Sequence, residues 1–187
     1  MHQLPFDSLS QFKNLRSFIL IQHDLSIVPA DAFQGIDTLE RIYINDAASS
    51  DITGSFYNIP NLVTLALNNN NITSIPANFC KTGSANIKEV DLSENLITEV
   101  DDGVFDVVTG LSIDVKFNFL TELSESTWRP LLEANAMVNA AGNPLKCGCD
   151  IAWMFEDSHL VNQIGGGTTC IDGTNIHAID PFIFDDC

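Results

Sequence analysis

Apolar residues recur along the chain in pairs separated by one position, and a single polar residue follows each pair. Leu65 and Leu67 precede Asn70 in this way, and the same order returns at residues 90–95. Alternate residues of a strand point to the same face of a sheet, so each pair predicts a short strand with one buried face. Apolar residues such as Ile72 continue beyond the polar position, which predicts a packed arm after each strand.

The whole pattern repeats as LxxLxLxxNxLxxL. The positions of its asparagine column follow one another at intervals of 24, 23, 25, 23 and 25 residues and hold His23, Ala47, Asn70, Asn95, Asn118 and Asn143. These intervals fall within the roughly 20–29 residues of a leucine-rich repeat. Strands of successive repeats then pair into one parallel sheet on the concave side. The predicted fold class is an α/β-type repeat solenoid, a curved leucine-rich-repeat array with a parallel concave sheet.

The asparagine ladder is the expected structural support of this array. A carboxamide has donors and an acceptor that can pair with backbone groups left over by each turn, at Asn70, Asn95, Asn118 and Asn143. Ala47 lacks these groups, so the turn through residues 45–54 is either a bulged recognition loop or a tolerated irregular repeat. A second apolar column is expected to stack along the back of the array, at Leu9, Phe33, Phe56, Phe105 and Trp128.

Cysteines cluster near the end of the chain. Four of the five lie within the last 41 residues, at Cys147, Cys149, Cys170 and Cys187. Four cysteines allow three disulfide pairings, and they could also bind zinc, although the C-G-C spacing departs from the usual C-x-x-C. Cys80 lies outside this cluster and is either a small buried residue or a bridge to another segment or chain.

The tail carries a specific resemblance. The residues that carry it are the last repeat asparagine with its proline, the C-x-C-x-x-x-W motif and two later cysteines, namely Asn143, Pro144, Cys147, Cys149, Trp153, Cys170 and Cys187. This segment resembles the C-terminal cysteine-rich cap of extracellular leucine-rich-repeat proteins. Most of the chain is similar to secreted arthropod proteins of this kind, in the family named after the non-catalytic subunit of decapod shrimp luciferase.

The resemblance implies the pairs Cys147–Cys170 and Cys149–Cys187, and a binding or stabilising role without catalysis. It also implies a disulfide-bonded cap over residues 143–187, after leucine-rich repeats over residues 1–142. Disulfides indicate an oxidising compartment, so we expect a secreted, extracellular protein. The sequon Asn71-Ile72-Thr73 predicts a glycosylation site at Asn71.

Charge and missing motifs exclude several functions. The chain has eight Lys and Arg and 25 Asp and Glu, giving a net charge of −17 that opposes binding to nucleic acids or anionic lipids.

No 18-residue apolar run is present, which excludes a transmembrane helix. No signal-peptide segment opens the sequence, so any export signal is expected to be removed or to lie outside it. We found no motif for a catalytic nucleophile, phosphate loop, metal or cofactor, so neither an enzyme nor a bound cofactor is expected.

The outward positions of the predicted strands form the candidate partner site. They comprise an apolar end and an acidic centre, namely Ile19, Ile21, Tyr43, Glu89, Asp91, Glu94 and Asp114. Exposed apolar residues on adjacent strands often mark an interface, and carboxylates steer basic partners. The first repeat is incomplete, so an upstream segment or another chain could instead cover Ile19 and Ile21.

Three functions fit these features. The first is a non-enzymatic extracellular protein that holds a protein partner on its concave face. The second is an accessory or structural subunit of a larger secreted complex, assembled through the first repeat or Cys80. The third is a carrier of a small apolar ligand, such as a pigment, bound near the apolar end or between subunits.

Overall fold

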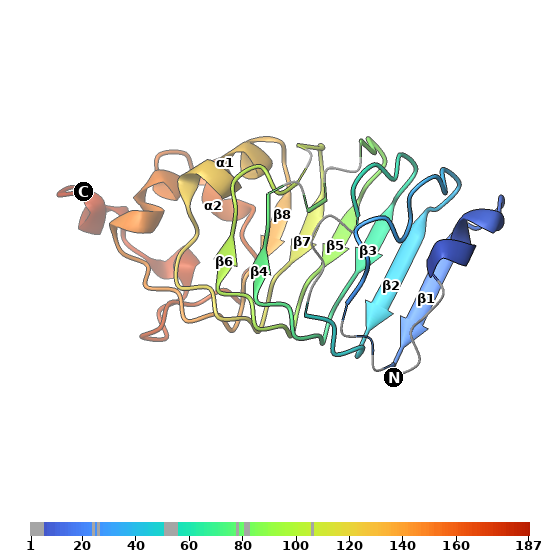
Figure 1. Ribbon diagram of the computed structural model, residues 1–187. Helices are drawn as coiled ribbons and strands as arrows, with labels where there is room; N and C mark the ends of the chain where they lie inside the picture. Colours follow the sequence, from blue (N-terminus) through green and yellow to red (C-terminus); the bar gives the residue numbers. More distant parts are fainter. Residues whose placement is uncertain are drawn as a thin grey trace.

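The chain folds into a parallel-strand solenoid in which each repeat contributes one strand to a common sheet. The computed structural model describes residues 6–23, 25, 27–50, 56–77, 79–80, 83–105 and 107–187. The sheet has six strands in spatial order, namely β1 (Ser17–Ile21), β2 (Arg41–Asn45), β3 (Thr64–Ala66), β5 (Glu89–Asp91), β7 (Ser112–Asp114) and β8 (Met137–Asn139). Figure 1 shows these strands side by side along the array. The predicted fold class is confirmed.

The strand register divides the side chains into an inward and an outward row. Leu65 pairs with Ile42 on one side and Val90 on the other, and all three side chains are buried. The next residue of each strand points outward, so Ile19, Tyr43, Ala66, Asp91, Asp114 and Asn139 form a continuous row. We call this outward side of the six-stranded sheet the concave face.

A column of phenylalanine rings fills the core behind the sheet. A two-stranded sheet of β4 (Ser74–Ile75) and β6 (Glu99–Val100) accompanies the arms of the middle repeats. Ring centroids follow one another at 6.1, 5.9, 5.4 and 6.3 Å through Phe6, Phe33, Phe56, Phe79 and Phe105. Of the predicted apolar column, Phe33, Phe56 and Phe105 stack in this series, Trp128 is buried in the core and Leu9 packs against it half-buried. The prediction missed Phe6 and Phe79.

Each ladder asparagine joins two repeats. The Asn95 Oδ1 accepts a hydrogen bond from the backbone N–H of Ile72 at 3.1 Å. Its Nδ2 donates to the carbonyls of Leu67 and Leu92, both at 3.0 Å. Leu67 and Ile72 belong to the preceding repeat, so one buried side chain ties neighbouring turns together. Equivalent bonds form at Asn70, Asn118 and Asn143.

The repeat that contains Ala47 replaces the missing carboxamide with other groups. The backbone N–H of Leu25 donates to the Ala47 carbonyl at 3.0 Å. The buried hydroxyl of Ser49 donates to the Leu25 carbonyl at 2.7 Å. The Asn70 Oδ1 accepts from the N–H groups of both Ala47 and Ser49. Residues 51–55 of the expected irregular turn lie outside the described residues.

Helical segments lie at both ends of the array. In the described residues, η1 (Phe6–Gln11) precedes β1, and α1 (Glu125–Glu133) lies between β7 and β8. The other helical segments follow β8, namely η2 (Cys149–Phe155), α2 (Ser158–Asn162), η3 (Ile176–Ala178) and η4 (Pro181–Phe184). The indole N–H of Trp153 donates to the carbonyls of Leu123 and Asp150, which attaches the cap to the arm that follows β7. No helix in the described part of the chain is long and apolar enough to cross a membrane.

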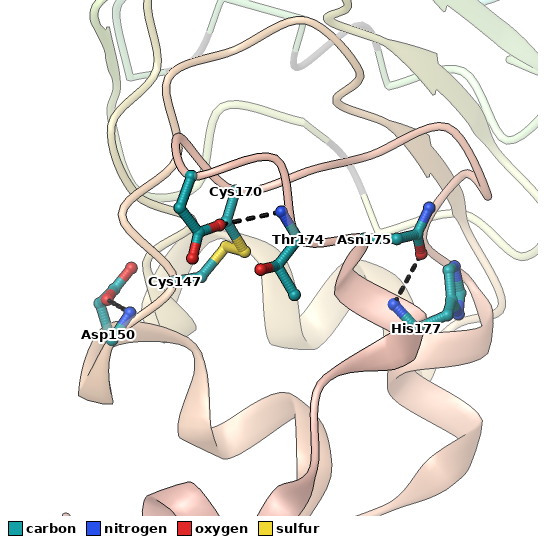
Figure 2. The surroundings of a disulfide bond; sticks show 8 residues. Cys147, Asp150, Cys170, Thr174, Asn175 and His177 are labelled. Carbon is teal, nitrogen blue, oxygen red and sulfur yellow. Dashed lines mark hydrogen bonds between the residues drawn. A yellow bond between two sulfur atoms is a disulfide. The ribbon is translucent and has the colours of Figure 1, made fainter.

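Two disulfides close the cap. They join Cys147 to Cys170 and Cys149 to Cys187, and Figure 2 shows the first beside the turn that contains Thr174. An Asp172 carboxylate accepts the Thr174 N–H at 2.9 Å and thereby holds that turn. This bond to the backbone, followed by one to the Thr174 side chain, lowers the pKa of Asp172.

The ladder predicts a large loss of stability for Asn95→Ala. The substitution leaves the Ile72 N–H and the Leu67 and Leu92 carbonyls without their partner in a buried site. We expect the free energy of unfolding to fall by about 1–3 kcal/mol, measured by denaturant titration. The matched control is Asn86→Ala, an exposed asparagine of the same repeat, which is expected to change little. Equal stability of both variants would contradict the ladder's role.

The second disulfide predicts a loss of stability through the unfolded chain. Cys149 and Cys187 are both exposed and lie 38 residues apart, so their bridge constrains a long segment without filling the core. Replacing both with serine is expected to lower the free energy of unfolding by about 3–4 kcal/mol. Thermal unfolding measures the loss, and an unchanged midpoint would show that the bridge does not restrain the cap.

Candidate partner-binding face

The apolar end of the concave face comes from the first two strands. Ile19 and Ile21 alternate with half-buried positions of β1 and are 61% and 54% exposed. Tyr43 lies beside Ile19 in the register of β2 and is half-buried. The structure therefore brings all three predicted apolar residues together, with both isoleucines facing solvent.

A pocket continues from this apolar end to the first edge of the array. It encloses about 330 Å³ between η1 and β1 and is lined mainly by apolar side chains, namely Phe6, Ser8, Leu9, Phe12, Phe18, Ile19 and Leu20. Sequence reasoning missed this pocket. The repeat template predicts which residues face the core, but not the path of η1, which forms the opposite wall.

Carboxylates of the acidic centre have different surroundings. Glu89 is exposed, whereas Asp91 and Asp114 are half-buried neighbours in the register of β5 and β7. One carboxylate oxygen of Asp91 accepts the Ser93 N–H at 2.9 Å, and this bond stabilises the end of the strand. The acidic centre is thus partly built into the turns that follow the strands.

Lys116 lies within the acidic centre and neutralises part of it. Its ammonium group is 3.1 Å from the Asp114 carboxylate, and the amide of Asn139 donates to the same oxygen at 3.1 Å. The hydrogen bond and charge of Asp114 raise the pKa of Lys116, with smaller contributions from Asp91 and Glu94. The sequence could have indicated this ion pair, because Lys116 follows Asp114 by two residues.

The remaining predicted residues lie away from this face or in the core. Asn71 is exposed, directly after the buried Asn70, and Thr73 of its sequon is exposed as well. Cys80 is buried in the main core, and its N–H donates to the Val104 carbonyl at 3.0 Å. This burial favours the interpretation of Cys80 as a small core residue. Among the described residues, no cluster of three or more His, Cys, Asp or Glu could hold a metal ion.

The ion pair predicts a measurable shift at Lys116. Asp114→Asn removes the charge next to the ammonium, so we expect the Lys116 pKa to fall back towards its ordinary 10.5. The pKa of Lys116 is raised in the folded chain. The pair therefore stabilises the fold fully below about pH 10 and loses this contribution as the pH rises through the folded pKa. NMR titration of the lysine Cε signals measures the shift. Asp37→Asn, at an exposed carboxylate of an early repeat, is the control that leaves it unchanged.

Comparisons with known sequences agree with this geometry. Residues 60–120 match the family model described as leucine rich repeat. Over 173 residues, or 91% of this chain, the sequence is 30% identical to the Oplophorus-luciferin 2-monooxygenase non-catalytic subunit of Oplophorus gracilirostris. The chain spans 48% of that protein, which is about half its length.

Solved structures share the fold at low sequence identity. A chain of the octameric complex of Latrophilin 3, Unc5D and FLRT2 (LRR) has a TM-score of 0.74 at 18% identity, over 92% of this chain and 55% of its own. A chain of the TLR13–ssRNA13 complex has a TM-score of 0.66 at 22% identity, over 73% of this chain and 19% of its own. The present chain is a leucine-rich-repeat solenoid. It resembles the Oplophorus-luciferin 2-monooxygenase non-catalytic subunit of Oplophorus gracilirostris.

Proposed function

We propose that this chain is a non-enzymatic extracellular binding protein that holds a protein partner on its concave face. The observation that carries the proposal is the exposed apolar end at Ile19 and Ile21, which shares one sheet surface with the acidic centre. Surfaces of this composition are typical of interfaces, because apolar groups contribute affinity and charges contribute orientation and association rate.

The two parts of the face would act differently on a partner. Burial of Ile19 and Ile21 by a partner removes apolar surface from water, which favours association. Tyr43 adds an aromatic residue of the kind that often dominates binding energy. Glu89 and Asp91 attract a basic partner, and the net charge of −17 adds to this attraction. Dissolved salt screens the charges and reduces the distance over which they act.

The cap supports an extracellular location. Disulfides persist mainly in oxidising compartments, and this cap has two of them. Asn71 is proposed as a glycosylation site because its side chain is exposed, close to the exposed Thr73 of its sequon.

We also propose that the chain divides into leucine-rich repeats over residues 1–142 and a cap over residues 143–187.

A subunit role is the second candidate. The matched relative is named as a non-catalytic subunit, and this chain spans about half its length. An accessory subunit needs a surface for its complex, and the apolar edge formed by η1 and β1 could supply one. In this case the concave face and the first edge would bind parts of the same assembly.

The pocket beside β1 favours a third candidate, carriage of a small apolar ligand. Its volume of about 330 Å³ is in the range of small-molecule sites, and three phenylalanines line it. An absorption spectrum of the protein purified from its natural source tests for a bound pigment. A spectrum with protein bands alone would remove the pigment hypothesis.

Substitution at the apolar end tests the leading proposal. We expect Ile19→Ser to weaken the binding of the natural partner by about tenfold or more, since it removes an exposed contact without disturbing the core. The partner is obtained by chemical cross-linking of the native protein, and its affinity is then measured with purified components.

Ile27→Ser is the matched control, because Ile27 is also an exposed isoleucine but lies outside the six-stranded sheet. It is expected to leave the affinity unchanged. Equal affinity of the wild type and Ile19→Ser, or an equal loss in both variants, would contradict binding through the apolar end of the concave face.

A further inference from the structure

Three exposed apolar residues follow the ends of β5 and β7. These two strands lie away from β1, which carries the apolar end of the concave face (Figure 1). Leu96, Phe117 and Phe119 are 43%, 57% and 52% exposed. Leu96 directly follows Asn95, while Phe117 and Phe119 lie on either side of Asn118. The N–H of Phe119 donates to the Ile97 carbonyl at 2.9 Å, which places the two repeats in contact here. We call these three residues the rim strip.

The backbone of the rim strip is strained at Phe117. The chain adopts a left-handed conformation at the same position of each repeat, at Gln22, Asp46, Asn69, Glu94, Phe117 and Gly142. Phe117 has φ of +53°, a conformation that is unfavourable for a bulky side chain. Asparagine or glycine would fit this position with less strain, so the fold tolerates an unfavourable residue that displays a ring to solvent.

Gly142 holds this ring in place. A Cβ atom built on Gly142 would lie 2.4 Å from the Cδ1 of Phe117 and 2.8 Å from its Cε1. The ring therefore rests directly against the backbone of the next repeat, and a side chain at position 142 would displace it. A ring that rests against backbone on one side has fewer open rotamers to lose when a partner binds, which favours affinity.

Acidic residues lie on the repeat adjacent to the exposed ring. The Glu94 N–H donates to the Lys116 carbonyl at 3.0 Å, so exposed Glu94 and Phe117 occupy equivalent positions in adjacent repeats. Asp91 lies three residues before Glu94 on the same face, and Lys116 is engaged by Asp114. An aromatic face next to carboxylates attracts an ammonium or guanidinium group, through ion pairing and cation–π attraction.

We propose that the rim strip docks a segment of a protein partner in which a basic side chain lies next to an apolar one. The apolar side chain packs on Leu96 and Phe119, and the basic side chain lies against Phe117 and Glu94. Charge complementarity selects this occupant, since an acidic segment would face the carboxylates of Glu94 and Asp91. The rim strip does not include Ile19, Ile21 or Tyr43, but Glu94 and Asp91 belong to the acidic centre. The inference therefore rests on the proposed function for its charges and adds a docking position away from the apolar end.

NMR with synthetic peptides tests the docking surface on the full chain. The probes are short peptides of alternating Arg and Leu, of Arg and Ser, and of Glu and Leu. We expect the Arg–Leu peptide to bind best and to shift the methyl signals of Leu96 and the ring signals of Phe117 and Phe119. Phe117→Asn is expected to raise the Kd of the Arg–Leu peptide about tenfold. The variant should retain the fold, because asparagine tolerates the left-handed conformation. Phe182→Asn, at an exposed phenylalanine of η4, is the matched control and leaves the Kd unchanged.

A charge variant and its control complete the test. Glu94→Gln is expected to weaken the Arg–Leu peptide and reduce the salt dependence of its Kd, whereas Glu99→Gln in β6 changes neither. Ile19→Ser is expected to leave peptide binding intact, so failure of this proposal is distinguishable from failure at the apolar end. Equal binding by Phe117→Asn and the wild type, or by the Glu–Leu and Arg–Leu peptides, would overturn the proposal. Self-association that Phe117→Asn abolishes would also overturn it, by showing that a second copy covers the rim strip.

Discussion

The fold depends on a buried carboxamide that recurs once per repeat and satisfies backbone groups of two turns at the same time. A solenoid buries a turn at the end of every strand, and backbone groups buried without partners would destabilise it. Asn95 illustrates the solution, since its bonds reach both its own strand and the turn of the preceding repeat. Neighbouring repeats are thus joined at fixed spacing, and the outward side chains of the sheet fall into straight rows. The candidate binding face is a consequence of that spacing.

Sequence reasoning succeeded where the physical requirement recurs with the repeat. The asparagine column and the alternating apolar pairs predicted the order and register of the strands, because both depend on residue type at fixed intervals. Ring stacking was less predictable, since Phe79 lies on an arm whose length the template does not fix. The same limit applies to the pocket, whose second wall is a helix before the first complete repeat.

Contacts between repeats were the least predictable part of the candidate site. Asp114 and Lys116 are close in sequence, but the Asp114–Asn139 bond joins residues 25 positions apart. Phe117 and Gly142 are also 25 positions apart, so neither residue alone indicates that a ring rests on a glycine. These contacts alter the predicted surface in two ways. Lys116 reduces the charge of the acidic centre, and the end of the face beyond β7 displays an exposed aromatic ring that rests on the next repeat.

Under the proposed function, the protein presents several surface patches to its partners. The disulfide-bonded cap fixes one end, and the apolar edge at η1 and β1 forms the other. The most direct test is the mass of the native protein purified from its natural source, compared with the mass of its own denatured chain. Our account predicts a larger native mass that includes a second, different polypeptide, cross-linked to the outward side of the sheet. A native mass equal to one chain, with no second polypeptide at physiological concentration, would contradict it.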